Sequence, residues 1–119
     1  MNVRLDKSRP VGPQICEGIC VAVVRGEFSP GQRLPSVRDM ALEMGVNPNT
    51  VQHAMESLGE QGLLYPVRGS GWYVQEDISR AMEVLEQLRE EKARDFFNTM
   101  AFLGLSAEET KEFVKEWVE

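Results

Sequence analysis

The sequence predicts a mainly α-helical protein that carries one small β-hairpin. Three observations lead to this prediction. Apolar residues recur every three or four positions over several stretches, which is the period of an amphipathic helix. Proline and glycine stand at the ends of these stretches, where helices commonly begin and end. Two short β-type runs, residues 63–67 and 72–74, flank a glycine-rich loop that is typical of a hairpin.

The bulk composition is that of an ordinary soluble globular protein. The chain has 119 residues, of which 42% are hydrophobic and 27% charged, enough for a small core with an appendage. No apolar run approaches the roughly 18 residues that a membrane helix needs, so we expect no membrane partner. Residues 1–9 are polar and lack the apolar segment of a secretory signal. These features predict a cytoplasmic protein.

The net charge of −6 is unusual for a nucleic-acid-binding protein, but the charge is unevenly distributed. Residues 1–75 hold seven basic and seven acidic side chains, whereas residues 76–119 hold six basic and twelve acidic ones. Residues 75–77 are typical of a link between two parts. We therefore expect two domains, residues 1–75 and 76–119, with the acidic domain facing away from any phosphates.

The first helix is expected over residues 13–25 and ends before Gly26. It carries Cys16 and Cys20 one turn apart on one face. A metal site would need further ligands, and the only histidine, His53, is far away in the sequence. We favour two buried thiols over a redox or metal role, and we expect no metal and no cofactor.

Two further helices are expected on either side of Gly45, over residues 37–44 and from residue 48 to the glycine at position 62. Ser36 and Asn47 precede them and are good N-caps. Two helices joined by so short a turn have the form of a helix-turn-helix. In such a unit the second helix enters the DNA major groove with its N-terminus first.

The start of this second helix exposes short polar side chains. Asparagine and glutamine can pair with adenine edges, and threonine can offer a methyl group to thymine or a hydroxyl to phosphate. For Asn47 alone, capping is a sufficient explanation. For the cluster, we favour DNA contact over an ordinary polar helix face. Its members are Asn47, Asn49, Thr50 and Gln52, with His53 beside them.

Two other segments suit DNA contacts. Ser36 and Arg38 lie at the start of the helix that crosses the DNA backbone in this arrangement, where phosphate contacts are expected. In the hairpin loop, small residues let the backbone approach DNA closely, and an arginine can reach a phosphate or the minor groove. A solvated surface arginine and a plain tight hairpin are the alternatives. The loop consists of Arg68, Gly69, Ser70 and Gly71.

No enzyme signature is present in the sequence. It contains no glycine-rich phosphate loop with a lysine, and no nucleophile beside a plausible histidine and acid pair. We therefore expect a protein that is not an enzyme.

Residues 76–119 are expected to form two helices separated at Gly104, the second with a capping box from Ser106. Two helices of this size cannot enclose a ligand pocket of several hundred Å³. Their apolar stripe is too large to leave in water, which favours an isologous homodimer over helices that fold back on their own chain. The stripe comprises Ile78, Met82, Leu85, Leu88, Phe96, Met100 and Trp117.

Four motifs in order resemble the GntR-type winged-helix regulators. They are LPSVRDMA at 34–41, GVNPNTV at 45–51, the stretch from 58 to 63, and RGSGWYV at 68–74. The preceding Pro-Gly at 30–31 strengthens the match, which covers about residues 10–74. The VNPNTV form and the short C-terminal part are similar to the YtrA-like branch. Gly59 and Trp72 depart from the family pattern, which has a helix former and a smaller wing residue there.

The resemblance implies a winged helix-turn-helix with a two-helix C-terminal dimerisation extension. It implies a bacterial repressor that binds a pseudo-palindromic, double-stranded operator as a homodimer. It also implies DNA contacts from Arg38, from the start of the recognition helix including Pro48, and from the wing tip at 68–71. No small-molecule effector is indicated by these motifs.

Two other functions remain open at this point. The acidic total charge and the few basic residues on the proposed DNA face would suit a winged-helix protein-interaction module that does not bind DNA. A ligand sensor with a pocket between two protomers is a third possibility, and it would require a small molecule that changes the affinity for DNA.

Overall fold

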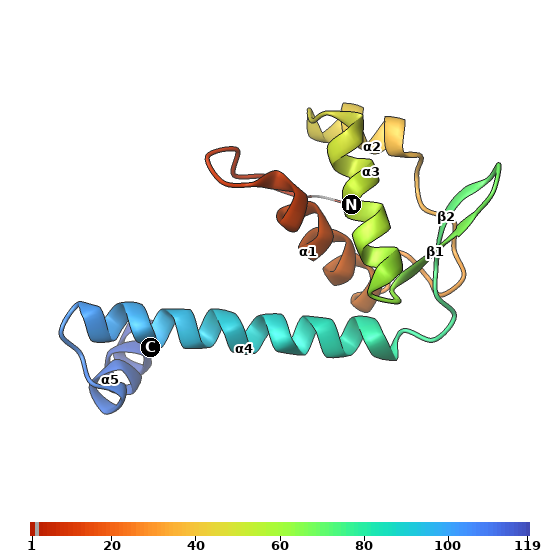
Figure 1. Cartoon of the computed structure of the whole chain (residues 1–119). Helices are drawn as coiled ribbons and strands as arrows, with labels where there is room; N and C mark the ends of the chain where they lie inside the picture. Colours follow the sequence, from red (N-terminus) through yellow and green to blue (C-terminus); the bar gives the residue numbers. More distant parts are fainter. Residues whose placement is uncertain (2) are drawn as a thin grey trace. The chain divides into compact units, whose positions relative to one another are not determined.

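The structure, a computed structural model, describes Met1 and residues 3–119. The chain divides into two compact units, Met1–Leu85 and Glu86–Glu119, so that α4 begins in the first and continues into the second. The described elements confirm a mainly α fold with a small β-wing (Figure 1). In order they are α1 (Val11–Val24), α2 (Val37–Met44), α3 (Pro48–Glu60), β1 (Leu64–Val67), β2 (Gly71–Val74), α4 (Ser79–Phe102) and α5 (Ala107–Val118).

The core of the first unit is built around α3, which packs against α1, α2 and β1. Val51, Met55 and Leu58 lie on one face of α3 and are almost completely buried. Ile15 and Ile19 of α1, one turn apart, are fully buried as well. Burying each such side chain stabilises the fold by roughly 1.5–3 kcal/mol. The opposite face of α3 is consequently left to solvent.

Local capping fixes the ends of α2 and α3 as the sequence predicts. The Ser36 hydroxyl accepts a hydrogen bond from the Asp39 N–H at 3.0 Å, and Asn47 Oδ1 accepts one from the Asn49 N–H at 2.8 Å. Gly45 ends α2 with a φ of +68°, a left-handed conformation that glycine adopts without strain. The turn between the two helices is therefore set by residues within a few positions of it.

The wing is the antiparallel hairpin of β1 and β2, with Leu64 opposite Val74 and Val67 opposite Gly71. The rings of Tyr65 and Tyr73 stack on one face of the hairpin, with centroids 5.6 Å apart. At the tip the Ser70 N–H donates to the carbonyl oxygen of the residue that ends β1, at 2.9 Å. The tip is thus a short, hydrogen-bonded loop.

The segment before α2 pairs with the edge of the wing. The Leu34 N–H donates to the Trp72 carbonyl oxygen, and the Val74 N–H donates to the Gln32 carbonyl oxygen, both at 2.9 Å. Arg33 lies opposite Tyr73 in an isolated antiparallel bridge. This pairing ties the start of α2 to the wing.

Trp72 occupies space above α3 that the absent side chain of Gly59 leaves free. A Cβ atom built on Gly59 would lie 2.9 Å from Cζ3 and 3.3 Å from Cη2 of the Trp72 ring. Both residues depart from the family pattern, and the structure shows that they are complementary. The glycine accommodates the indole between the recognition helix and the wing.

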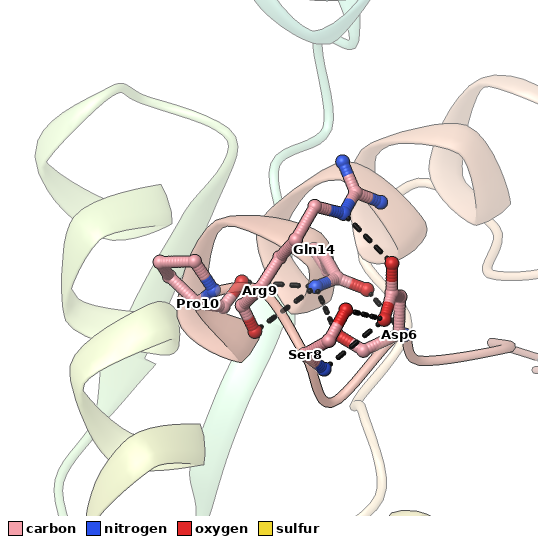
Figure 2. A network of polar contacts seen from close by, with 5 residues as sticks. All are labelled: Asp6, Ser8, Arg9, Pro10 and Gln14. Carbon is pink, nitrogen blue, oxygen red and sulfur yellow. Dashed lines mark hydrogen bonds and ion pairs between the residues drawn. The ribbon is translucent and has the colours of Figure 1, made fainter.

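The N-terminal arm, residues 3–10, is folded back onto α1 by Gln14 (Figure 2). Gln14 Oε1 accepts a hydrogen bond from the Asp6 N–H at 2.8 Å, and Gln14 Nε2 donates to the carbonyl oxygens of Asp6 and Pro10 at 2.9 and 3.0 Å. The Asp6 carboxylate in turn accepts hydrogen bonds from Ser8 and Arg9. These hydrogen bonds hold the pKa of Asp6 below its ordinary value.

The arm also contacts the helix-turn-helix. Lys7 Nζ donates to the Gly45 carbonyl oxygen at 3.0 Å, at the negative end of the α2 dipole. The Val3 side chain lies against Gly18 of α1, where a Cβ atom would come within 2.6 Å of it. The arm is therefore part of the first unit rather than a free tail.

In the second unit, the predicted capping box starts α5. The Ser106 hydroxyl accepts a hydrogen bond from the Glu109 N–H at 3.1 Å, and a Glu109 carboxylate oxygen accepts one from the Ser106 N–H at 2.9 Å. The Thr110 hydroxyl is buried and donates to the Ser106 carbonyl oxygen at 2.8 Å. Gly104, with a φ of +101°, lies in the turn that follows α4.

The complementarity of Gly59 and Trp72 can be measured in a double-mutant cycle. In the wild-type background, Gly59→Ala should lower the free energy of unfolding by about 1 kcal/mol, because the new methyl group overpacks the indole. In a Trp72→Leu background, the same substitution should raise it by up to about 1 kcal/mol, since alanine is the better helix former. Urea denaturation measures all four variants. An equal effect in both backgrounds would contradict this contact.

The Asp6 network makes the N-terminal arm sensitive to acid. Because the pKa of Asp6 is lowered in the folded state, its contribution is fully present above the ordinary value of 3.8 and is lost as the pH falls through the lowered pKa. A carbon-detected NMR titration should place the Asp6 midpoint below 3.8. Ser8→Ala should raise that midpoint, because the hydrogen bond from the Ser8 side chain is the largest cause of the lowered pKa of Asp6. A wild-type midpoint at or above the ordinary value would refute this.

Candidate nucleic-acid interface

The polar face of α3 lies opposite its buried face. Asn49 and His53 are exposed, whereas Thr50 and Gln52 are half-buried near the edges of the face. Pro48 is exposed at the first helical position, where its missing N–H costs no hydrogen bond. The side chains that the sequence places on one recognition surface therefore do lie together at the beginning of α3.

Two residues of the predicted site also act as helix caps. The Asn47 and Ser36 side-chain oxygens each accept an N–H of their own helix. A hydroxyl that accepts one hydrogen bond still has a proton to donate, so Ser36 can also donate to a phosphate. Capping and DNA contact are thus compatible at Ser36.

Gln52 is held in place by a partner that sequence reasoning did not include in the site. Its amide nitrogen donates to Glu56 Oε1 at 3.1 Å, one helical turn later. This bond orients the amide and leaves a second N–H and the carbonyl oxygen for a base edge. Glu56 is exposed on the same face and can accept from the amino group of cytosine. The i,i+4 spacing is the signal that could have identified it.

A shallow hollow lies between the start of α2, the recognition helix α3 and the wing. It brings together four residues of the predicted site, Ser36, Gln52, Ser70 and Gly71. The Ser70 hydroxyl and the Tyr73 hydroxyl are hydrogen-bonded, which fixes the wing tip. The other residues that line this hollow are Arg33, Leu34, Pro35, Val37 and Trp72.

Three arginines surround this surface without a protein partner. Arg38 lies in the first turn of α2, Arg68 in the wing tip and Arg33 beside β2, and all three are exposed. Within the described part of the chain, no hydrogen bond or ion pair engages their guanidinium groups. Positive charge that is not used inside the protein is available to an anionic ligand.

The apolar residues assigned to dimerisation differ in exposure. Leu85 is buried within the first unit, and so its own chain already covers it. Ile78, Leu88 and Met100 are half-buried. Met82, Phe96 and Trp117 are more exposed, at 54%, 41% and 78%.

The second unit exposes further apolar side chains beyond those assigned to dimerisation. Phe102 is 89% exposed at the end of α4, next to the exposed Leu103, and Phe113 and Val118 are exposed on α5. The signal in the sequence was present, because these residues continue the apolar spacing on both sides of Gly104. Together they leave a large apolar area in a unit of only two helical segments.

The two cysteines lie at contacts between helices. Cys16 Sγ is 3.6 Å from the Ala54 carbonyl oxygen, and Cys20 Sγ is 3.4 Å from the Ala81 carbonyl oxygen. Burial raises the pKa of both thiols, which disfavours the thiolate that redox and metal chemistry require. In the described residues, no three His, Cys, Asp or Glu side chains are grouped as metal ligands. No described helix is both long and apolar enough to span a bilayer.

Comparison with known proteins places these motifs in one family. The family model described as bacterial regulatory proteins of the gntR family matches residues 14–74, from α1 to the end of the wing. The chain is 35% identical to the uncharacterized HTH-type transcriptional regulator YhcF of Bacillus subtilis, over 100% of this chain and 98% of that protein. It is 30% identical to the HTH-type transcriptional repressor YtrA of the same organism, over 92% and 85% of the two chains.

Solved structures agree with this assignment. A GntR family transcriptional regulator from Listeria monocytogenes superposes with a TM-score of 0.82 at 34% identity, covering 94% of this chain and 98% of that chain. The DNA-binding domain of AraR in complex with operator ORR3 superposes with a TM-score of 0.54 at 30% identity, over 62% and 87% of the chains. The chain therefore belongs to the GntR family of bacterial regulatory proteins, as a YtrA-like, DNA-binding transcriptional regulator.

Proposed function

We propose that this regulator is a repressor that binds a pseudo-palindromic DNA duplex as a homodimer. The observation that carries the proposal is the exposed polar face of α3, which buried Val51 and Met55 hold in a fixed orientation. Arg38 lies on α2, before α3 in the sequence, and Arg68 lies in the wing, after α3. Neither guanidinium group pairs with a residue in the described part of the chain. The protein acts by binding rather than by catalysis and needs no cofactor.

In this proposal α3 reads bases in the major groove. Asn49 and Thr50 lie in its first turn, and Gln52 and His53 follow on the same face. Gln52 is the best placed for a specific contact, because its amide is already oriented by Glu56 and can bond the N6 and N7 edge of adenine. Such contacts would determine sequence preference.

The remaining site residues position the protein on the backbone. Ser36 and Arg38 meet a phosphate at the start of α2, and Asn47 and Pro48 approach the strand where α3 enters the groove. The wing tip, with Arg68, Gly69, Ser70 and Gly71, enters the adjacent minor groove, where small residues permit close approach.

Dimerisation supplies affinity that one protomer lacks. Residues 1–75 are electrically neutral, so each protomer makes few phosphate contacts. Two protomers joined through the exposed apolar residues of the second unit would bind two half-sites about 34–36 Å apart. The relative YtrA is named a repressor, which supports repression here.

A second function is favoured by one specific observation. The recognition face carries the carboxylate of Glu56 on a unit with no net positive charge, which would suit a winged-helix module that binds another protein. Salt titration on duplex DNA separates the two functions, since binding through phosphates weakens steeply with salt. A folded, dimeric chain that binds no duplex at low salt would support the protein-interaction module.

The division between backbone and base contacts can be tested on a duplex that the wild-type protein selects from a randomised pool. Arg38→Ala should weaken binding to the selected duplex and to an unrelated duplex alike, and lower the salt slope by about 1 per protomer. Gln52→Ala should instead lose about 1–3 kcal/mol of discrimination at one base position. Arg25→Ala, at an exposed arginine after α1, is the control. If both variants bind like the control, the site is wrongly assigned.

The role of the second unit in dimerisation can be tested at Trp117. Trp117→Gln should shift the dimer–monomer equilibrium at least tenfold towards monomer. An indole that becomes buried at a protein interface is a common anchor, and its removal costs about 2 kcal/mol or more of binding free energy. Lys115→Gln, a neighbouring exposed change on α5, should leave the equilibrium unchanged. Sedimentation equilibrium measures both variants. A Trp117→Gln protein that dimerises like wild type would exclude this residue from the interface.

A further inference from the structure

Arg33 holds a defined position beside the wing, and its side chain pairs with no residue that the structure describes. Its place in the sequence motifs does not explain either feature. Its backbone is fixed by the bridge to Tyr73 and by the neighbouring hydrogen bond from Leu34 to Trp72. Its Nε and Nη2 atoms lie 3.5 and 3.9 Å from the position that a Cβ atom on Gly71 would occupy. The side chain therefore extends along the wing towards its tip, over a residue that has no side chain to obstruct it.

The same arginine lines the hollow between α2, α3 and the wing. Ser36, Gln52 and Ser70 line this hollow with it. The guanidinium group of Arg33 is exposed and forms no hydrogen bond or ion pair with any residue that the structure describes. Asp39 shares a neighbouring depression with Arg33 but does not pair with it. A cation that pairs with none of the described residues, in a hollow that also holds the polar side chains of Ser36, Gln52 and Ser70, points to an anionic ligand.

The geometry of duplex DNA specifies which anion reaches this hollow. When a recognition helix lies in the major groove and a wing lies in the adjacent minor groove, one sugar-phosphate strand separates the two grooves. That strand must pass between α3 and the wing, which is where the hollow lies. A guanidinium group suits such a phosphate, because it can donate two parallel hydrogen bonds to it.

We propose that Arg33 binds a backbone phosphate of the DNA strand that crosses between the recognition helix and the wing. This inference rests on the proposed binding of duplex DNA and adds a contact outside the recognition helix and the wing tip. Ser36 is placed to donate a second hydrogen bond to the same strand, since its hydroxyl proton is free. The contact would position the wing relative to α3 on the duplex and would not read sequence.

The first test compares Arg33→Gln with Arg25→Gln, which removes the same charge from an exposed arginine that lines none of the hollow. The probes are the duplex selected by the wild type and an unrelated duplex of equal length. Arg33→Gln should weaken binding to both about tenfold and lower the salt slope by about 1 per protomer. Arg33→Lys should retain the salt slope. Circular dichroism checks that each variant is folded.

The second test locates the phosphate. Single methylphosphonate linkages, which are uncharged, are placed in turn along the selected duplex. Wild type should lose affinity at the linkage between the major-groove half-site and the adjacent minor groove, whereas Arg33→Gln should show no further loss there. The proposal is overturned if Arg33→Gln binds like Arg25→Gln, if it weakens only the selected duplex, or if it keeps wild-type sensitivity at every linkage. A wild type that binds neither duplex would instead refute DNA binding itself.

Discussion

The burial of one face of α3 against α1, α2 and β1 is the constraint on which the rest of the structure depends. Val51, Met55 and Leu58 fix the rotation of α3 about its own axis. Because an α-helix has 3.6 residues per turn, this rotation also fixes the direction in which every other side chain of α3 points. The packing that stabilises the first unit therefore also determines which side chains face outward, so stability and recognition depend on the same residues.

The wing and α2 are joined to this helix by short-range pairing rather than by a large core. Backbone hydrogen bonds from the segment before α2 to β2 hold Ser36, Arg33 and the wing tip around one hollow. Because residues 1–75 are neutral, the arrangement of a few unpaired arginines is more important than total charge. The proposed homodimer would share the binding between two protomers, which would compensate for so few cations.

The sequence could predict the elements whose signals are local. The caps at Ser36 and Asn47 and the capping box at Ser106 each depend on a few neighbouring residues, and all are present as expected. The contact of Trp72 with Gly59 and the position of Arg33 beside Gly71 could not be predicted, because they join distant segments. Apolar spacing likewise identifies a stripe but not what covers it, which is why one stripe includes both buried Leu85 and exposed Trp117.

The fit of the Trp72 indole over Gly59 has a consequence for how this protein can evolve. A side chain gained at position 59 while the indole is present meets a clash, and the loss of the indole alone leaves unfilled space, so each single change costs stability. The effect of either change therefore depends on the residue at the other position. A lineage can exchange this pair at little cost only if both positions change, so the wing and the recognition helix are expected to evolve together at this contact.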